Sequence, residues 1–592
     1  TKDPDIKTKG PGWPSMNGNI IGISVATDSF KGYYPISHEA GSNMDAKMVL
    51  NWVQDVCRAP GVKVFHNAAY DIGWLRAHGI IVYGKVADTM IAAALIDENR
   101  RNYSLNSLSM DYLSELKSEA GLKEAAKEWG IDAKGEMYKL PPKFVGPYAE
   151  QDAALTLRLW QRFKIEIIKQ NLSDVWEMEM ELLPLLIHMR AKGVRVDLDG
   201  AHELKKEFVK KEKQALLKIK KSAGTDIDIW AARSIAKAFD KLKIPYSLTE
   251  KSKEPSFTQN WLTNCKAPIA KLIREAREVS KFHSTFIDSI FKFEHKGRVH
   301  AEINQLRGDS GGTVSGRLSY AHPNLQQVPA RNKDLGPRIR SLFIADKDCR
   351  WGSFDYSQQE PRLVVHYAAS IGFAGSNDLI KAYQDEDADF HQTVADMAGI
   401  PRSQAKTINL GIFYGMGKNK LSRELGIDKQ QAEQILQEYN QRVPFVKQLA
   451  NNAMDAADKN GAIWTLKGRK CRFEEWEPSS FGLYKATTFD DAVNKYGRGN
   501  IKRAYTYKAL NRLIQGSAAD QVKQAMIDCA KAGLYPILQI HDELCFNLKW
   551  EALEPQYKQI KEIMENCIPE LKVPSKVDIS IGKNWGSTNE IT

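Results

Sequence analysis

Hydrophobic and polar positions follow two different periods along the first part of the chain. Short apolar runs within 19–26, 61–72 and 79–84 have the length of buried strands. Residues 88–97 and 151–163 instead repeat apolar side chains every three or four positions, which is the period of a helix with one face against a core. Strand patterns that alternate with helical patterns predict an α/β domain, which we expect to end near residue 170.

The pattern changes twice after that point. Residues 172–300 are almost wholly helical in period and rich in Lys and Glu, with a loop predicted at 249–257, where Pro and Ser interrupt the helices. A second long helical stretch covers about 375–455. Strand patterns return on either side of it, at 299–306, 350–357 and 535–548. This order predicts a sheet domain into which helices are inserted.

Composition narrows the class of protein. At 592 residues the chain is long enough for about three to six domains. Its 43% hydrophobic and 27% charged residues are ordinary for a globular protein. No apolar run approaches the roughly 18 residues that span a bilayer, so we expect a soluble protein without a membrane partner. Seven cysteines without a C-x-x-C pair argue against a disulfide scaffold and a zinc ribbon, and favour a reducing, intracellular location.

The excess of positive charge points weakly to a polyanionic partner. Lys and Arg number 84 against 73 Asp and Glu, a formal net charge of +11. Eight lysines and three glutamates lie on the strongly helical stretch 203–221. A solvated helix face and a surface that follows a nucleic acid backbone both explain this stretch, and composition does not choose between them.

Two aspartates lie where predicted strands end. Asp355 closes one strand, and Asp542 lies with His541 and Glu543 between two apolar runs, a pattern that predicts a β-hairpin with acids at its turn. Carboxylates on adjacent strands are hard oxygen ligands that suit two magnesium ions and leave coordination positions for phosphates. Taken alone, each acid is better explained as a turn or surface carboxylate.

A further pattern is a helix face with two cations. Pro401 marks the start of the helix, and Arg402, Lys406 and Leu410 follow at intervals of four, with Tyr414 shifted around the helix. Such a face suits a nucleoside triphosphate, because the cations would neutralise the phosphates while the far end packs on the base. An ordinary amphipathic surface helix is the alternative explanation of the same spacing.

Five segments, in this order, resemble the motif set of the family A DNA polymerases, the class of bacterial DNA polymerase I and of phage replicative polymerases. They are residues 313–329, 355–362, 401–415, 512–520 and 539–544. The resemblance runs from the first domain to the C-terminus, and five long motifs in one order are too many for a chance match.

The resemblance implies a multidomain α/β and α+β fold, an RNase H-like 3′–5′ exonuclease domain followed by a right-hand polymerase. On this comparison the exonuclease-like domain covers 1–170, and the thumb with its connecting helices covers 171–300. The palm is divided, with its first part at 301–374 and its second part at 501–592. The fingers and adjoining elements occupy 375–500.

The resemblance further implies a template-directed DNA polymerase that extends a primer 3′-OH with dNTPs, using two Mg²⁺ ions. Asp355 and Asp542 would be the catalytic metal ligands, and Glu543 an auxiliary acid. Glu360 would exclude a ribose 2′-OH by sterics, and Leu410 stands where the family usually presents Phe or Tyr. The residues implied for the incoming dNTP are Gln358, Glu360, His391, Arg402, Lys406, Leu410 and Tyr414.

A second implied set contacts DNA. Arg317 and Gln515 would touch the minor-groove edge of the primer-terminal pair, where acceptors are shared by all Watson–Crick pairs, so binding should be independent of sequence and sensitive to salt. The lysine-rich helix would follow the duplex backbone as part of the thumb. The implied DNA-binding residues are Arg317, Asn324, Gln326, Asn511, Gln515 and His541.

The first domain matches only part of the family's exonuclease site. The matching residues are Asn67, Asp71, Tyr148 and Asp152. By spacing alone, a helix-surface pair explains the last two equally well. The family's first motif, an Asp-x-Glu on the opening strand, is not found, and we do not accept Asp3 and Asp5, which flank Pro4 without an apolar strand before them. Because the chain starts on Thr1 about where that motif should end, we expect an inactive exonuclease domain.

Two other functions remain as alternatives. A stand-alone 3′–5′ exonuclease would leave everything after residue 170 unexplained, and intact Asp355, Asp542, Arg402 and Lys406 argue against a catalytically inactive DNA-binding accessory subunit. An RNA polymerase fits less well because of Glu360. We expect a monomer that binds primer–template DNA and dNTPs in the cytoplasm of a bacterial or phage-infected cell. An organelle and a processivity factor are left open.

Overall fold

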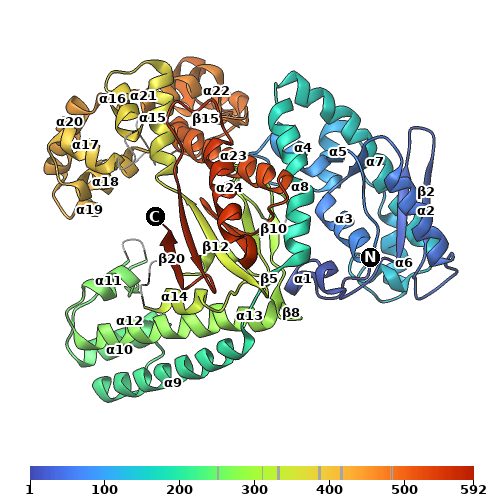
Figure 1. The fold of residues 1–592 in the computed structure, drawn as a ribbon, viewed down its shortest axis with the longest axis horizontal. Coiled ribbons are helices and arrows are strands. Elements are labelled where there is room, and N and C mark those ends of the chain that lie inside the picture. The colour runs from blue at the N-terminus through green and yellow to red at the C-terminus, as the bar shows by residue number, and fades with distance from the viewer. Residues whose placement is uncertain are drawn as a thin grey trace.

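The computed structural model describes residues 1–249, 252–309, 311–329, 332, 334–384, 389–413, 418–480, 482 and 484–591. In Figure 1 the N-terminal part of the chain forms one body on the right, and the remainder surrounds a central sheet on the left. Long helices coloured green lie below this sheet, and helices coloured gold lie at its upper left. The sheet is therefore flanked by helices that come from different parts of the sequence.

The N-terminal body combines strands with helices, which confirms the predicted α/β domain. β1 (Gly22–Ala26) and β2 (Lys31–Pro35) form an antiparallel hairpin, while β3 (Lys63–Phe65) pairs in parallel with β4 (Val86–Asp88). A parallel pair needs a crossover, and α3 supplies it. The helices of this body are α2 (Ala46–Arg58), α3 (Ala68–Ala77), α4 (Thr89–Ile96), α5 (Leu105–Leu113), α6 (Ala120–Glu128) and α7 (Pro142–Lys169).

One apolar run of this body is not a strand. Residues 79–84 are irregular, and the strand β4 begins only afterwards. The Gln54 side chain satisfies the backbone here, since its Nε2 donates to the Ile81 carbonyl at 3.1 Å and its Oε1 accepts from the Ile81 amide at 3.0 Å. Ile80 is buried without joining the sheet. The strand prediction was wrong because this apolar run has no ladder partner, and only Ile80 of it enters the core while Ile81 and Tyr83 are exposed.

The helical prediction for the next segment is confirmed. Its predicted loop is in part a short hairpin, since β6 (Ser247–Leu248) pairs with β7 (Pro255–Ser256). Three more two-residue strands, β5 (Val194–Arg195), β8 (Glu294–His295) and β9 (Arg298–Val299), close its ends. Its helices are α8 (Ser173–Lys192), α9 (Leu198–Ala223), α10 (Ala232–Lys241), α11 (Gln259–Asn264), α12 (Pro268–Lys281), η3 (Phe282–Ile287) and α13 (Asp288–Phe293).

The central sheet has five antiparallel strands in the order β17-β18-β12-β19-β20. The predicted strand and hairpin are both confirmed. Trp351 and Phe354 of the central strand β12 are fully buried, and α15 (Gln359–Ile371), α23 (Ala509–Lys531) and α24 (Leu553–Asn566) pack nearby. The strands are β12 (Cys349–Tyr356), β17 (Pro536–Ile540), β18 (Glu543–Lys549), β19 (Val577–Gly582) and β20 (Thr588–Ile591). A separate pair, β10 (Glu302–Asn304) with β11 (Ser319–Ala321), lies within the first part of this region.

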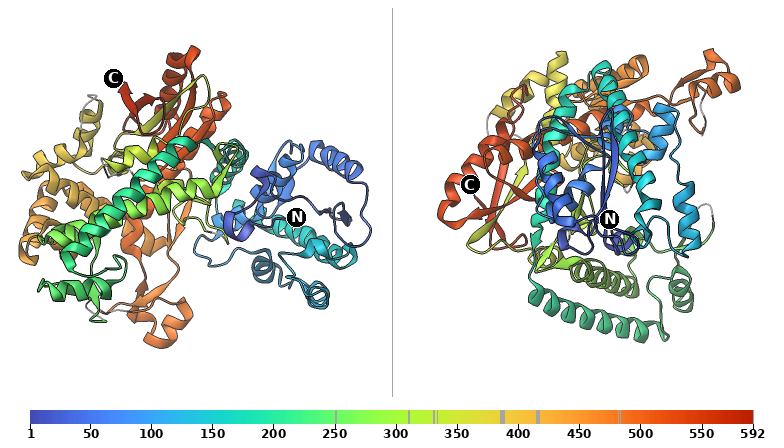
Figure 2. Two further views of the ribbon diagram at one scale, coloured as in Figure 1. Left: turned by 90° about the horizontal axis from the view of Figure 1, so that it is seen from below. Right: turned by 90° about the vertical axis from the view of Figure 1, so that its right-hand side faces the viewer.

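The inserted helical stretch is also confirmed. It contains α16 (Ser376–Gln384), α17 (Phe390–Ala398), α18 (Arg402–Phe413), α19 (Lys418–Leu425), α20 (Lys429–Arg442) and α21 (Pro444–Asn460). After it come β13 (Ala462–Trp464), β14 (Lys470–Arg472), β15 (Trp476–Pro478), α22 (Phe489–Tyr496) and β16 (Ile501–Arg503). The segment from β15 to β16 projects away from the rest of the molecule in both views of Figure 2.

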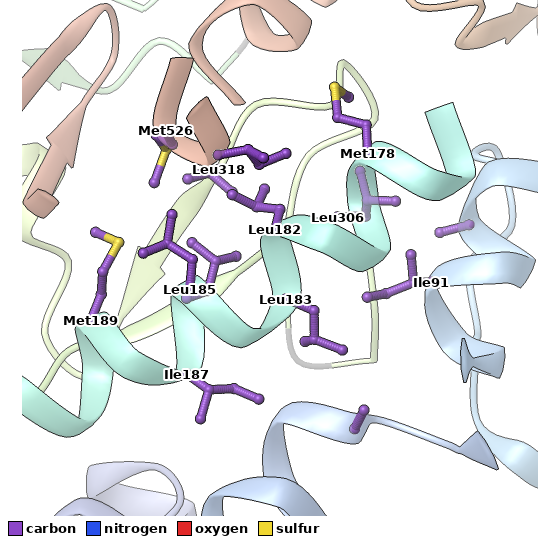
Figure 3. Close-up of a cluster of buried hydrophobic side chains, with 14 of the residues drawn as sticks. Ile91, Met178, Leu182, Leu183, Leu185, Ile187, Met189, Leu306, Leu318 and Met526 are labelled. Atoms are coloured by element: carbon purple, nitrogen blue, oxygen red, sulfur yellow. The ribbon is translucent and has the colours of Figure 1, made fainter. Parts of the chain in front are cut away.

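Helix α8 joins the two bodies through a continuous apolar core. Leu182 points toward Leu318 and Met526, whereas Leu183 lies on the side that faces Ile91 of α4 (Figure 3). All five side chains belong to one cluster of buried residues. Burial of apolar surface on both sides of one helix stabilises the N-terminal body and the sheet together.

A buried charged side chain, Glu179, lies on this same helix. Glu179 is fully buried and receives hydrogen bonds from Arg469 at 2.5 Å, Lys523 at 2.7 Å and the Gln305 side chain at 2.6 Å. The two cations hold the pKa of Glu179 below its usual value despite its burial.

Among the described residues, no helix combines the length and the apolar character that crossing a membrane requires.

Candidate functional site

The predicted carboxylates meet at the end of the central strands. Antiparallel pairing puts Asp355 of β12 opposite Glu543 of β18 and opposite Asp578 of β19. Asp542 lies in the turn between β17 and β18, and its carbonyl oxygen accepts a hydrogen bond from the Tyr356 amide at 3.2 Å. The hairpin therefore brings Asp542 beside Asp355, as the sequence pattern predicts.

These acids lie in an environment that opposes their ionisation. Burial, with the charges of Asp542, Glu543 and Asp578, raises the pKa of Asp355 to about 8. Burial also raises the pKa of Asp542. Neighbouring carboxylates that are short of solvent favour either a shared proton or a cation between them.

The donor set fits a hard divalent cation with few protein ligands. No group of three or more His, Cys, Asp or Glu side chains is gathered as a closed metal cage in the described part of the chain. Glu543 Oε1 accepts a hydrogen bond from Trp585 Nε1 at 3.3 Å, which turns this acid partly toward the sheet. Asp355 and Asp542 remain as the candidate metal ligands. Mg²⁺ characteristically binds one or two carboxylates together with phosphates and water.

A cationic cluster lies on α17 and α18. As Pro401 predicts, α18 begins at Arg402, and the Arg402 Nε donates to Asp389 Oδ2 at 2.8 Å. Burial lowers the pKa of His391 to about 4, with Asp389 opposing the shift and Lys406 and Arg402 adding to it. The His391 ring is therefore neutral near pH 7. Arg402, Lys406 and His391 thus act on one another electrostatically, and the structure brings them together.

Asn409 supports this cluster and was missed by sequence reasoning. It is fully buried, its Nδ2 lies 3.1 Å from His391 Nδ1, and its Oδ1 accepts a hydrogen bond from the Tyr439 hydroxyl. A buried polar residue on α18 carries no signal of its own in a single sequence, because its partners come from other helices. Tyr414 and the side chain of Leu410 lie outside the described part of the structure.

Gln358 and Glu360 occupy the start of α15. Gln358 adopts a φ of +52°, and its Oε1 accepts hydrogen bonds from the Phe390 amide at 2.8 Å and the Tyr383 hydroxyl at 3.3 Å. Glu360 Oε1 accepts a hydrogen bond from Arg317 Nη2 at 2.6 Å. A residue predicted for the sugar side and one predicted for DNA are therefore paired with each other.

The remaining predicted DNA-binding residues form two groups. Gln326 Nε2 donates to Gln539 Oε1 at 3.2 Å, and Gln539 Nε2 donates to the His541 carbonyl at 2.5 Å. Asn324 caps this turn through the Gln326 amide at 3.1 Å. Gln539, which sequence reasoning missed, links Gln326 to the hairpin that carries Asp542.

The second group is on α23. Asn511 and Gln515 stand one helical turn apart on this helix. Gln515 lines an open groove together with Ser315, whereas Arg317, Gln326 and His541 line a narrow cavity of about 20 Å³. Gln515 and Arg317 thus line two different hollows.

The predicted exonuclease residues also come together. Burial, opposed by the Thr1 amino group, raises the pKa of Asp71 to about 7, and Asp88 and Asp152 add to the shift. Asp152 forms an ion pair with Lys117 at 2.8 Å, and the same ammonium donates to the Tyr148 hydroxyl at 2.9 Å.

Asp88 and Lys117 are the members of this site that the sequence did not suggest. Asp88 accepts hydrogen bonds from the Asn67 amide at 3.0 Å and the Ala68 amide at 2.7 Å, which fixes the start of α3. Asp3, which the sequence pattern does not support as a substitute metal ligand, accepts a hydrogen bond from the Gly12 amide at 3.1 Å.

Comparison with known proteins accounts for both bodies. The model of DNA polymerase family A matches residues 199–587, and the model of 3′–5′ exonucleases matches residues 13–168. A DNA-directed DNA polymerase of Pseudomonas phage M6 is 36% identical, over 99% of this chain and 93% of that protein. DNA polymerase I of Pseudomonas aeruginosa is 28% identical, over 96% of this chain and 62% of that protein.

A solved structure agrees with these relatives. The polymerase domain of Pol1 from M. smegmatis, in complex with DNA primer–template and dNTP, superimposes with a TM-score of 0.77 at 25% identity, covering 95% of this chain and 92% of that one. The family match extends over the sheet, the inserted helices and the hairpin, which a stand-alone exonuclease would lack. The chain belongs to DNA polymerase family A, with an exonuclease-type domain in front of its polymerase region.

Proposed function

We propose that this protein extends the 3′-OH of a primer on a DNA template by a two-metal mechanism. The observation that carries the proposal is the pair Asp355, in β12, and Asp542, in the β17–β18 turn, two desolvated and adjacent carboxylates in a chain of DNA polymerase family A. The primer oxygen attacks the α-phosphate of a dNTP, and pyrophosphate leaves.

Asp355 and Asp542 would hold the ions, with Glu543 as an auxiliary acid. When bound, Mg²⁺ would activate the attacking hydroxyl and stabilise the leaving pyrophosphate. The raised pKa values support this role, because a cation between the carboxylates compensates the repulsion that now opposes their ionisation. Ion identity and number belong to the proposal.

The cluster on α17 and α18 would receive the triphosphate. Arg402 and Lys406 neutralise phosphate oxygens, and neutral His391 donates one hydrogen bond from its ring without adding charge. Leu410 and Tyr414, farther along the same segment, would lie toward the base and sugar. Electrostatic preorganisation of this kind favours the transition state, in which charge moves onto the leaving phosphates.

The sugar and the primer terminus would meet at α15. Gln358 and Glu360 would lie beneath the sugar, where the Glu360 carboxylate leaves no volume for a 2′-OH. Its ion pair with Arg317 supports this position, because it fixes the carboxylate of a flexible side chain. Arg317 and Gln515 would contact the minor groove, with Asn324, Gln326, Asn511 and His541 near the duplex.

We propose little nuclease activity for this chain. Asp152 forms an ion pair with Lys117, Asp3 accepts hydrogen bonds from the Gly12 amide, and the Thr1 amino group interacts with Asp71, so protein groups already engage the carboxylates that a metal ion would need. We further propose that the domains end near residues 170, 300, 374 and 500. The protein would be a monomer and would act inside a bacterial or phage-infected cell. The match to phage and bacterial polymerases supports that location.

The test is primer extension on a templated oligonucleotide. Full extension is expected with dNTPs and Mg²⁺, little with rNTPs, and none after chelation of the metal. A parallel reaction without dNTPs measures degradation of the primer and is expected to show little. Absence of templated extension by the unmodified protein would refute the proposed function, and rapid loss of primer would refute the nuclease proposal alone.

A further inference from the structure

One oxygen of Glu543 is held by two side chains that the proposed reaction does not use. Glu543 Oε1 accepts hydrogen bonds from Trp585 Nε1 at 3.3 Å and from Cys545 Sγ at 3.4 Å. Within the described ranges, Glu543 Oε2 has no hydrogen bond. Glu543 stands opposite Asp355 in the ladder between β12 and β18, so the two side chains project from the same face of the sheet. The donors therefore fix one oxygen and leave the other available beside the proposed metal ligand.

The stronger of the two donors, Trp585, is itself held on several sides. It lies in the turn between β19 and β20 and is 3% exposed. Its amide donates to the Phe343 carbonyl at 3.0 Å, and its ring stacks on Trp351 with centroids 6.1 Å apart and planes inclined by 21°. The Arg340 guanidinium lies 4.2 Å from the centroid of the same ring. These contacts fix the ring and, with it, the direction of the N–H bond.

The next residue anchors the whole turn. A Cβ at Gly586 would collide with the Pro337 carbonyl oxygen of α14 (Leu335–Arg340) and with the Ser341 amide nitrogen that follows this helix. Only glycine lets the turn approach the backbone of α14 so closely. The turn that carries Trp585 is therefore packed directly against a helix and does not depend on the C-terminal residues after β20 for its position.

The weaker donor is part of a short chain of polar groups along the sheet. Trp351 Nε1 donates to Ser353 Oγ at 3.1 Å, and Ser353 Oγ lies 3.8 Å from Cys545 Sγ. Ser353 stands opposite Cys545 in the same ladder, and the Cys545 side chain is fully buried. Because a thiol is a weak donor, the indole of Trp585 contributes more to the orientation of Glu543.

We propose that Trp585 is a positioning residue of the polymerase site, whose N–H bond orients Glu543 toward the reacting groups. The inference rests on the proposed function, since it takes Glu543 as the auxiliary acid of nucleotide transfer. A Glu side chain has several rotatable bonds, and a misplacement of about 1 Å at an active site can cost about a hundredfold in rate. A turn near the C-terminus would thus affect the reaction without touching substrate.

A purely structural role for Trp585 predicts a different behaviour. The ring belongs to a cluster of buried apolar residues, so its removal from this cluster would lower stability whatever residue stands at position 543. A positioning role instead requires that the effect of Trp585 on the reaction disappears when the Glu543 carboxylate is absent. The two roles can therefore be separated by a double-mutant cycle.

Single-turnover insertion of one dNTP, with and without Glu543, tests the inference. Trp585→Phe keeps an aromatic ring but removes the donor, and is expected to lower the maximal rate about tenfold. The KM for dNTP and the affinity for primer–template should stay unchanged, because neither substrate touches the indole. In a Glu543→Ala background the same replacement should change the rate by less than about twofold, since the group through which Trp585 acts is gone.

Two further variants complete the cycle. Trp550→Phe is the matched control, because an arginine guanidinium also lies 4.2 Å from this ring, whereas the side chain is 59% exposed and distant from Glu543; its rate should equal that of the unmodified protein. Cys545→Ala removes the weaker donor and should lower the rate about twofold to threefold, again only when Glu543 is present. If Trp585→Phe does not fold, the cycle of Cys545→Ala with Glu543→Ala decides by the same criterion.

Two results would overturn this inference alone. Equal effects of Trp585→Phe with and without Glu543 would show that the ring acts through packing. A normal rate in Glu543→Ala would leave no auxiliary acid to position. In both cases the unmodified protein still extends primers, so the proposed function stands, whereas absence of extension by the unmodified protein would refute that function itself.

Discussion

At the scale of single residues, the carboxylates of Asp355 and Asp542 repel each other in the free protein, and both are proposed metal ligands. Asp355→Ala and Asp542→Ala are each expected to lower the rate of single-nucleotide insertion about a thousandfold or more, since each removes a ligand of the reacting centre. The melting temperature should stay the same or rise, because one of two repelling buried acids is gone. Glu590→Gln, at an exposed acid of β20, should change neither quantity. Near-normal turnover by either alanine variant would contradict the metal assignment.

Glu360 tests sugar selection. Glu360→Ala opens volume beneath C2′ and is expected to reduce the preference for dNTPs over rNTPs by about tenfold or more. Glu360→Gln keeps nearly the same volume and should keep most of the preference, although it weakens the ion pair with Arg317. Competition between dNTP and rNTP at a single template position measures both. If the glutamine and alanine variants change the ratio equally, charge and not volume determines selection.

Leu410 is the clearest departure from the family's motifs. Leucine has neither a ring face nor a hydroxyl, so it offers no hydrogen bond in place of a missing 3′-OH. We expect strong discrimination against dideoxynucleotides, relaxed about tenfold or more in Leu410→Tyr, which is the scale of one added hydrogen bond. Competitive incorporation of ddNTP against dNTP is the measurement. Unchanged ratios would show that position 410 does not contact the sugar, and would undo the register that assigns Arg402 and Lys406.

At the scale of elements, α18 depends on a buried amide. Asn409→Ala leaves the Tyr439 hydroxyl without its acceptor and His391 without its neighbour, so the free energy of unfolding should fall by about 1–3 kcal/mol. The KM for dNTP should rise several-fold, because His391 loses its fixed orientation. Denaturant unfolding and single-turnover kinetics give the two values. Gln434→Ala, which removes an exposed hydrogen bond to Glu438 on α20, is the control; an effect as large as that of Asn409→Ala would argue against a special role for the buried amide.

Elements with a strong local pattern could be predicted from the sequence. Pro401 fixed the start of α18, and alternating apolar runs around Asp542 predicted the β17–β18 hairpin. Residues 79–84 had an equally apolar run, yet the backbone of Ile81 pairs with the Gln54 side chain and not with a strand. Of this run only Ile80 is buried, whereas Ile81 and Tyr83 are exposed, so an apolar run by itself establishes neither burial nor the partner of a backbone group.

Residues whose role depends on distant partners could not be found in this way. Asn409, Gln539 and Lys117 gain their roles from partners on other elements. The ion pair between Arg317 and Glu360 joins positions 43 residues apart. The assigned chemistry came instead from ordered motifs, which identify the reacting groups but not the side chains that position them.

At the scale of the whole molecule, two kinds of contact join the N-terminal body to the polymerase region. The apolar faces of α8 form one core with both. The buried pair of Glu98 and Arg472, 6% and 4% exposed, adds a directional link. Apolar burial stabilises without fixing a register, whereas a buried ion pair fixes which groups face each other.

Removal of one member of this pair should therefore affect both stability and the register between the two bodies. Glu98→Ala leaves the Arg472 guanidinium buried without its carboxylate and is expected to reduce the free energy of unfolding by about 3–5 kcal/mol. The double replacement Glu98→Leu with Arg472→Leu should recover much of that loss, because no uncompensated charge remains. Duplex affinity should stay reduced in the double variant, since the register between the N-terminal body and the polymerase region is no longer fixed. Glu254→Ala, which breaks the exposed pair with Arg233, should leave the melting temperature and the affinity almost unchanged. Calorimetry and anisotropy on the same samples decide the matter: recovery of both quantities in the double variant would show that the pair stabilises the junction without affecting how DNA is bound.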